Sequence, residues 1–600
     1  MKWVRRVDPY LILLFGLSLF ALAPLAAPGY FYSAHDGRHS VFYLIQFDAA
    51  IRDGALWPRW AMHHIQGYGY PTFIIQAPLA FYVAELFVLL GAGMTAAVKL
   101  AWALGTLLSG WGMYALVRRW VTQSAPGNRA SLAGLVAGLL YVYAPYHLLD
   151  IYVRAAYAEF MLMLWFPWVF LAFDRLIDLG LDRGWQGRLA LAAFSFAGLL
   201  LTHVFSLLAF TPLLMGFIFF KLGVVLWRGK AGARGRGSFV GRTLLAGAAG
   251  AAGILLTAVF VIPLLLEGPL LDQAVYVRET YDFTRHFVFL GQFFNPFWGY
   301  GFSDDPTGVN DGMSFQVGAM LLALLLTAAI TLWRAQSRRL LMGFLLAATA
   351  AILFTMTPAA TWIWATVPMM EVIQFPWRLL ALSSFTAAAL GGLVVFHLLP
   401  EDGTDLGSAY RGPVLILALL VIFAVFPFTH PGAQEPIEPW REDGRAIFQF
   451  ETAHPDMIAF TSWVKEPFVT SPMTPDYAAE NYSAATLSRL GILSGQGKVT
   501  AVYSRGSSFG GAVDMSTPGV VQIRTYYFPG FRAKVDGQPV DLRVSDPNGL
   551  MEVDVPAGPH TIDVRMGTTP ARTAGTLISW ATALGLVGLW AWSRRRSPNP

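Results

Sequence analysis

The chain has 600 residues, of which 55% are hydrophobic and only 13% are charged, whereas ordinary globular proteins are about 25% charged. Such a composition cannot cover several soluble domains with polar surface, so it predicts a polytopic membrane protein. The net charge is +5, but most basic residues lie between apolar stretches, where they act as topology signals and not as a nucleic-acid surface. The sequence has no cysteine, which excludes disulfides, thiol nucleophiles and Cys-ligated zinc.

Twelve apolar stretches have about the length that a bilayer core requires of a helix. They are 10–27, 98–117, 131–148, 160–175, 189–205, 206–226, 243–266, 314–333, 340–357, 377–398, 413–429 and 574–592. The first could also be a cleaved signal peptide, but an uncleaved anchor is expected where eleven further spans follow. The stretch 72–91 is apolar too, but a full span there would put Arg118, Arg119 and Arg129 outside, and Pro71 and Pro78 are expected to interrupt helices near the interface. We therefore expect interfacial or re-entrant helices there, within a first outer loop at 28–97.

The distribution of basic residues gives the orientation. With these spans, 22 of the 42 basic residues lie on the cytoplasmic side and eight in outer loops before residue 430. The remaining 12 lie in 430–573, a stretch long enough to be translocated regardless of its charge. The prediction is a multi-pass protein of the plasma (inner) membrane with both termini in the cytoplasm.

The hydrophobic pattern divides the chain into three parts: a helical membrane domain at 1–429, an extracytoplasmic part at 430–573, and a final span with a basic cytoplasmic tail at 574–600. Period-two alternation in the second part predicts an antiparallel β domain, taken to be a sandwich, with strands at 520–528, 532–535, 540–544, 550–555 and 560–566. Asp536-Gly537 predicts a hairpin turn. The Pro-rich stretch 430–500 indicates no definite fold.

Polar residues at membrane level are informative because desolvating them is costly. Four groups occur at the expected outer ends of spans: His35, Asp36, His39 and Arg59; His147, Asp150, Arg154 and Glu159; the loop 267–313; and Gln374 with Arg378. Each has a structural alternative. Asp36 could cap a helix that begins near Gly37, Asp150 and Arg154 could form a local ion pair, and Arg378 could reach toward lipid phosphate.

Cofactor motifs are largely missing. The histidines of the first loop, with Asp36, are ligand types for a divalent metal, which stays an alternative, but tight ligand spacing such as His-Glu-x-x-His does not occur. No cofactor is therefore predicted. The one Gly-rich run, 229–237, lies in a basic loop with no preceding strand, which argues against nucleotide use.

Several short motifs resemble one group of bacterial membrane proteins. They are His35-Asp36, Trp57-Pro58-Arg59-Trp60, Gly67-Tyr68-Gly69-Tyr70-Pro71, Gln374-Phe375-Pro376-Trp377-Arg378, and the closing stretch from Tyr526 to His560. The group comprises the YfhO-like multispan proteins and those labelled 6-pyruvoyl-tetrahydropterin synthase-related, although the zinc site of that soluble synthase has no counterpart here. These proteins in turn resemble the GT-C class of membrane glycosyltransferases.

The GT-C resemblance implies that Asp36 matches the catalytic acidic residue of the first outer loop, and that Asp150 or Glu159 matches a second acidic position. It also implies a polyprenyl-phosphate-linked sugar as donor. GT-C enzymes often carry two adjacent acidic residues in the first loop, where this chain has His35-Asp36.

The predicted function is a membrane glycosyltransferase that moves a sugar from this lipid donor to a carbohydrate, glycolipid or glycoprotein acceptor of the cell envelope. Asp36 is the expected general base and Glu159 a second catalytic residue. The expected substrate-binding residues are His35, His39, Arg59, His147, Asp150, Arg154, Gln374 and Arg378. Membrane lipids are further expected partners, and nucleic acid is not. Two alternatives stay open. One is a transporter or flippase for a lipid-linked sugar, in which discontinuous helices are expected. The other is a non-catalytic scaffold for envelope assembly.

Overall fold

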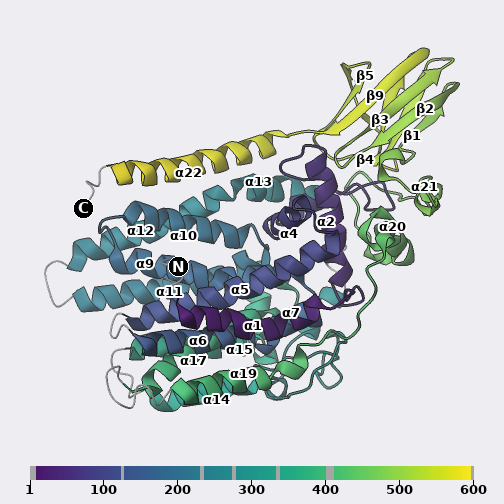
Figure 1. Ribbon diagram of the computed structural model, residues 1–600. Coiled ribbons are helices and arrows are strands. Elements are labelled where there is room, and N and C mark those ends of the chain that lie inside the picture. Colours follow the sequence, from purple (N-terminus) through teal and green to yellow (C-terminus); the bar gives the residue numbers. More distant parts are fainter. Residues whose placement is uncertain are drawn as a thin grey trace, which may run out of the picture.

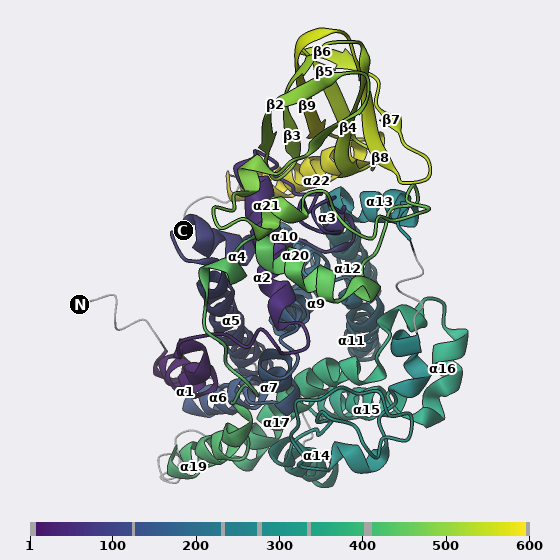
Figure 2. The same ribbon diagram turned by 90° about the vertical axis from the view of Figure 1, so that its right-hand side faces the viewer.

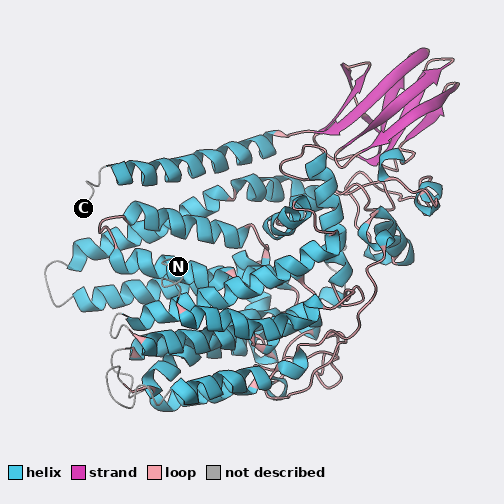
Figure 3. Cartoon of the chain, in the orientation of Figure 1, coloured by secondary structure: helices cyan, strands magenta, loops and turns pink. Residues whose placement is uncertain are grey.

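The computed structural model describes residues 8–122, 127–229, 235–272, 279–332, 338–400 and 411–595. Part of the expected basic loop, 230–234, and the end of the expected tail, 596–600, lie outside these ranges. The helices run side by side in one bundle, with a β domain at one end (Figures 1 and 3). The last helix starts at the β domain and returns along the bundle to the opposite end (Figure 1).

The bundle is built from α-helices of very different length. In chain order they are α1 (Pro9–Ala26), α2 (Gly37–Arg52), α3 (Thr72–Ile75), α4 (Leu79–Leu89), α5 (Met94–Thr122), α6 (Asn128–Val142), α7 (Pro145–Tyr152), α8 (Tyr157–Met163), α9 (Trp165–Leu179), α10 (Trp185–Leu200), α11 (Phe205–Gly229), α12 (Gly235–Leu256), α13 (Ala258–Glu267), α14 (Ala319–Thr331), α15 (Arg339–Thr355), α16 (Thr361–Thr366), α17 (Leu380–Leu398), α19 (Arg411–Phe423), α20 (Gly444–Ala453), α21 (Thr474–Ala478) and α22 (Pro570–Arg595). The central one is α17, whose residues are buried from Leu380 to Phe396.

Eight helices of the described part are long and apolar enough to cross a membrane, and two bent helix pairs raise the number to ten. This confirms the predicted multi-pass helical protein with a C-terminal antiparallel β part. The expected count of twelve is too high by this measure. The stretches 189–205 and 314–333 contain α10 and α14, whose 16 and 13 residues fall short of the roughly 20 that a bilayer core needs.

The segment 72–91 forms two separate helices, as expected. α3 has four residues and α4 has 11, so neither reaches across a bilayer core of about 30 Å. Pro78 occupies the position before α4, where a residue without an N–H breaks no helical hydrogen bond.

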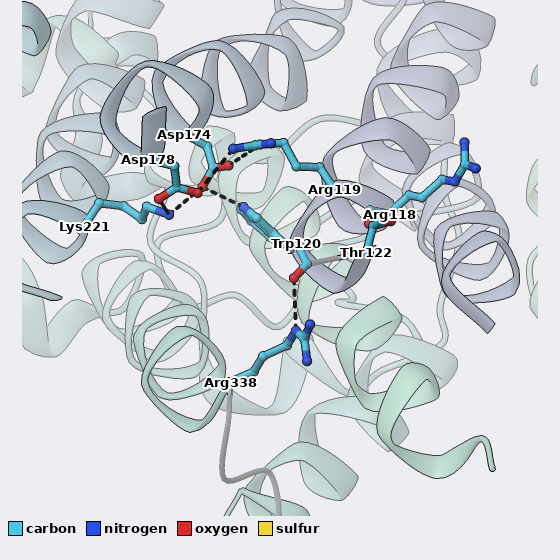
Figure 4. Close-up of polar contacts among 8 residues, drawn as sticks. All are labelled: Arg118, Arg119, Trp120, Thr122, Asp174, Asp178, Lys221 and Arg338. Atoms are coloured by element: carbon cyan, nitrogen blue, oxygen red, sulfur yellow. Dashed lines mark hydrogen bonds and ion pairs between the residues drawn. The ribbon is translucent and has the colours of Figure 1, made fainter. Parts of the chain in front are cut away.

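The two ends of the bundle are marked by α5. Near its start, the Thr95 N–H donates to Glu442 Oε1 at 2.6 Å, which ties this end to the segment before the β domain. From Thr95 the helix extends about 36 Å to Arg119, which pairs with Asp174 and Asp178 of α9 at 2.6 and 3.2 Å (Figure 4). We call these the β-domain end and the far end.

At the far end, positive charges meet the buried Asp174 and the half-buried Asp178. Lys221 of α11 contacts Asp174 at 2.8 Å and Asp178 at 2.6 Å (Figure 4), and the Trp120 indole donates to Asp174. The carboxylates therefore fasten α5, α9 and α11 together. Several basic residues that the sequence assigned to one side of the membrane occupy this end, among them Arg118, Arg119, Arg175, Lys221 and Arg338.

The β domain consists of two antiparallel sheets. Its strands are β1 (Leu490–Ser494), β2 (Gly497–Ser504), β3 (Ser508–Met515), β4 (Gly519–Tyr526), β5 (Phe531–Val535), β6 (Gln538–Val540), β7 (Arg543–Val544), β8 (Leu550–Val555) and β9 (Gly558–Met566). The sheet orders are β1-β4-β8-β7 and β2-β3-β9-β5-β6. Side chains of both sheets share one core, for example Val521 and Val553 with Val513 and Val564, which is the packing of a sandwich.

The hairpin predicted at Asp536-Gly537 joins β5 to β6, with Val535 opposite Gln538. Both turn residues have positive φ, 51° and 79°, as the tight turn that matches strand twist requires. Strands β1 to β3 lie where no strand was predicted.

The β domain is fastened to the segment 28–97, which connects α1 to α5 (Figure 2). The buried Arg489 guanidinium donates to the carbonyls of Gly67 at 2.6 Å and Met62 at 2.9 Å. Asp53 accepts from the Ser507 N–H and the Ser508 hydroxyl, both at 2.9 Å. The two segments therefore form one body at this end of the bundle.

Candidate functional site

A buried ion cluster lies between α7 and α8. Arg154 pairs with Asp150 and, through two separate nitrogens, with Glu159 at 2.9 and 3.0 Å. The Tyr146 hydroxyl donates to the same Glu159 carboxylate at 2.6 Å. Glu159 is only 2% exposed and Arg154 only 3%, so the charges must neutralise each other within the protein.

Arg378 joins this cluster from another part of the chain. It lies in the 3-10 turn η9 (Pro376–Leu379), directly before α17, and its Nε is 3.2 Å from Glu159 Oε2. Its Nη1 donates to the Ile373 carbonyl at 3.0 Å and to the Gln374 side chain at 3.4 Å. The Arg378 guanidinium is thus held by its neighbours, including Gln374. The backbone of Gln374 has a positive φ of 66°. For a residue with a Cβ this is a strained conformation of the kind that clusters at functional sites.

Two aromatic rings support the two arginines. Phe375 and Trp377 stack at 5.0 Å. The Arg378 guanidinium lies 4.8 Å from the Phe375 ring, and that of Arg154 lies 4.6 Å from the Trp377 ring. Stacking on aromatic faces is a geometry that arginine adopts and lysine does not reproduce.

Asp36 occupies the position before α2, but its side chain makes no capping hydrogen bond. Its backbone N–H donates to the Arg154 carbonyl at 2.7 Å, which places the residue beside the ion cluster. Within the described part of the chain its half-buried carboxylate accepts no hydrogen bond. The capping alternative for Asp36 therefore fails, and the carboxylate is available to another group.

His203, in the turn between α10 and α11, connects the parts of the site. The charges that act on it are those of Glu159, Arg378, Arg154 and Asp36. His203 is therefore within electrostatic range of Asp36 and of the ion cluster. Sequence reasoning missed His203, which the rule used for the other groups could have found, because it is a polar residue at the end of an apolar stretch.

His35 and His39 flank Asp36. The His35 ring stacks on Phe302 at 4.3 Å and its Nε2 lies 3.3 Å from the Tyr300 carbonyl. Desolvation by the surrounding protein lowers the pKa of both histidines below the usual value, against the opposing effect of Asp36. Both rings are therefore neutral at pH 7 and act as hydrogen-bonding groups, not as cations.

Two expected residues have their contacts elsewhere. His147 bonds the Tyr141 carbonyl and packs against Phe160. Arg59 donates to the Val259 carbonyl at 2.6 Å, and the nearest charges are those of Arg572 and Glu267 under the β domain. The structure thus brings together Asp36, Asp150, Arg154, Glu159, Gln374 and Arg378, with His35 next to Asp36. The His39 ring packs against Tyr43 and Phe450, and His147 and Arg59 do not contact the cluster.

The histidines that suggested a metal alternative have other partners. His64 pairs with Glu451 at 2.7 Å, and His63 bonds the Tyr477 hydroxyl at 2.8 Å. In the residues that the structure describes, no three His, Asp or Glu side chains are grouped so that they could hold a metal ion.

Comparison with known proteins gives only distant likenesses. No protein-family model and no curated protein matches the chain. Among solved structures, arabinofuranosyltransferase AftD from Mycobacteria is 14% identical with a TM-score of 0.40, over 94% of this chain and 40% of that one; a mutant form of it gives 15% and 0.41, over 75% and 30%. Arabinosyltransferase EmbB from Mycobacterium smegmatis is 10% identical with a TM-score of 0.35, over 95% and 64%. The chain thus spans less than two thirds of these proteins, and likenesses at this level transfer neither residues nor activity.

Proposed function

We propose that the protein is a membrane glycosyltransferase of the GT-C type that transfers a sugar from a polyprenyl-phosphate donor to an acceptor of the cell envelope. The observation that supports the proposal is that Asp36, whose backbone N–H bonds the Arg154 carbonyl, lies beside the ion cluster in which Arg378 contacts Glu159. The site thus combines a carboxylate without a hydrogen bond in the described structure and a guanidinium held in place by its neighbours.

The chemistry needs one base and one partner for the leaving group. Asp36 takes the proton of the acceptor hydroxyl as its oxygen forms a bond to the anomeric carbon. The bond from that carbon to the phosphate oxygen breaks, and the electron pair leaves with the lipid phosphate. Arg378 stabilises the charge that develops there, because its planar fork matches two phosphate oxygens.

In this proposal Glu159 is a positioning residue, not a second catalytic group. Its two oxygens are occupied by Tyr146, Arg154 and Arg378, which leaves it little capacity to accept a further proton. Asp150 acts in the same way on Arg154. The neutral His35 and His39, beside Asp36, are placed to hydrogen-bond sugar hydroxyls.

For the orientation, we place the β domain outside the cytoplasm and the far end inside. The far end carries Arg118, Arg119, Arg175 and Lys221, and cytoplasmic ends of spans are enriched in Lys and Arg. Site and β domain then share the outer side, where envelope acceptors occur.

A transporter or flippase for a lipid-linked sugar is the second candidate, favoured by two bent helix pairs. The axes of α6 and α7 differ by 41°, and α15 differs by 89° from the helical stretch Pro358–Thr366. Discontinuous helices around a binding site are typical of transporters.

The deciding experiment uses the full chain in lipid vesicles, with a panel of sugar-labelled undecaprenyl phosphates and an acceptor glycan extract. Transfer predicts release of free undecaprenyl phosphate by the wild type and its loss in Asp36→Asn, with donor binding retained. Transport predicts movement of intact donor across the bilayer without release. Release that persists in Asp36→Asn would exclude the proposed base.

A further inference from the structure

A pocket lies at the far end of the bundle, away from the site described above. Its volume is about 460 Å³, and its walls come from the start of α1, the last turns of α5 and the end of α9. Three arginines line it, Arg118, Arg119 and Arg175, together with a single carboxylate, Asp8.

The charges of the pocket do not cancel. Asp8 already accepts a hydrogen bond from the Tyr114 hydroxyl at 2.5 Å and pairs with Arg118 at 3.1 Å. Arg119 points instead into the network of Asp174 and Asp178 (Figure 4). Exposed Arg175 has no ion pair or hydrogen bond within the described ranges. The pocket therefore offers Arg118 and Arg175 to an anion.

Arg118 is free to turn toward such an anion. Its side chain is 44% exposed, and it extends away from the network of Arg119 and Asp174 (Figure 4). Its only ion pair among the described residues is the shared one with Asp8. A second acceptor can thus bind this guanidinium without breaking the helix contacts.

The other half of the pocket is apolar and faces the perimeter of the bundle. Trp111, two helical turns or about 10 Å before Arg118 on α5, is 39% exposed and packs edge-to-face on Trp168 at 5.3 Å. The neighbouring α1 exposes Ile12 and Leu19, as expected of a helix in contact with lipid.

We propose that this pocket binds an anionic phospholipid, with the phosphate between Arg118 and Arg175 and an acyl chain along Trp111. A basic pocket between helices at a membrane surface suits such a headgroup. A soluble phosphate shares the headgroup chemistry, but only a lipid also covers the Trp111 side of the pocket.

The test measures lipid retention by native mass spectrometry of the full chain, purified in detergent and offered phosphatidylglycerol or phosphatidylcholine. Wild type should retain phosphatidylglycerol in preference. The double variant Arg118→Gln/Arg175→Gln should lose retention by about fivefold for each arginine removed. Arg183→Gln is the matched control, because Arg183 is an exposed arginine between α9 and α10 at the same end and outside the pocket lining.

Three outcomes would overturn the proposal: equal retention of the two lipids by the wild type, equal loss in the Arg183→Gln control, or displacement of phosphatidylglycerol by excess inorganic phosphate. The last outcome would assign the pocket to a soluble anion. To exclude misfolding of the double variant, its thermal unfolding in phosphatidylcholine should match that of the wild type, while phosphatidylglycerol should stabilise the wild type alone.

Discussion

Arg378 Nε lies 3.2 Å from Glu159 Oε2, the same oxygen that accepts a hydrogen bond from Arg154 at 3.0 Å. One buried carboxylate therefore anchors two guanidinium groups, one before α8 and one before the central helix α17. Because Glu159 is inaccessible to water, it determines where Arg378 lies and does not itself meet substrate.

Replacement of Glu159 should cost both stability and donor binding. Glu159→Gln leaves the buried Arg154 and the half-buried Arg378 with less negative charge, and breaking a buried pair such as that of Glu159 and Arg154 costs about 3–5 kcal/mol. We expect a lower thermal unfolding midpoint and weaker binding of undecaprenyl phosphate. Glu371→Gln, an exposed carboxylate in the turn just before Arg378, is the control and should change neither; a Glu159→Gln variant as stable as the wild type would contradict the anchoring role.

Asp36→Asn should separate catalysis from folding. Loss of a general base lowers the rate of transfer by about 10²- to 10⁴-fold. Since the Asp36 side chain forms no capping bond, unfolding should be unchanged, whereas loss of a true cap costs about 1 kcal/mol. Paired measurements of transfer rate and unfolding free energy check this, with Asp304→Asn in the exposed loop as control. Wild-type rates in Asp36→Asn would remove the base from the mechanism.

Much of this fold could be predicted from the sequence because its strongest signals are local. The apolar length of 377–398 predicts α17, and Asp536-Gly537 predicts the hairpin, since each depends on adjacent residues. Strand β3 was missed because it contains Gly510 and Gly511, which weaken a strand pattern. These glycines are needed for close approach: a Cβ on Gly510 would lie 2.0 Å from the Ile562 carbonyl oxygen of β9.

The candidate site was predicted in part, for a related reason. The expected outer ends of spans bring Asp36, Arg154, Glu159 and Arg378 to one place, because span ends on one side of a membrane share a plane. The direction in which a side chain points within that plane cannot be predicted from the positions of span ends. His147 lies on the same short helix as Asp150 but bonds the Tyr141 carbonyl, and its role as a substrate ligand stays a prediction without a supporting contact.

Arg378→Lys should weaken donor binding while the chain still folds. Lysine keeps the charge but cannot provide the fork to phosphate or the stacking on Phe375. We expect the KM for donor to rise about tenfold or more, as for loss of one charge-assisted bond of about 1.5–3 kcal/mol, with a smaller change in kcat. Arg285→Lys is the matched control, because Arg285 is a loop arginine that pairs with Glu279. An unchanged KM in Arg378→Lys would argue against a phosphate role.

The proposed orientation can be tested directly because the chain has no cysteine. A single cysteine introduced by Thr122→Cys at the far end should react with a membrane-impermeant maleimide only after the cells are opened. One introduced by Thr500→Cys, on the exposed face of β2, should react in intact cells. Labelling of both positions from the same side would overturn the topology.

Acid should loosen the β domain from the segment 28–97 through His63. Burial lowers the pKa of His63 to about 3, below the value of about 6.5 that an unfolded histidine has. The imidazole of His63 is therefore neutral when the β domain is docked. Docking is therefore fully stable above pH 6.5 and loses about 1.4 kcal/mol for each pH unit below it. The ring bonds Tyr477 of α21, and the positive Arg489 lies nearby, so protonation places two cations against each other.

Hydrogen exchange of 474–478, corrected for its intrinsic pH dependence, should rise between pH 7 and pH 5. In His63→Gln this rise should disappear, whereas a rise of equal size in that variant would assign the pH dependence to another group, such as the His64–Glu451 pair.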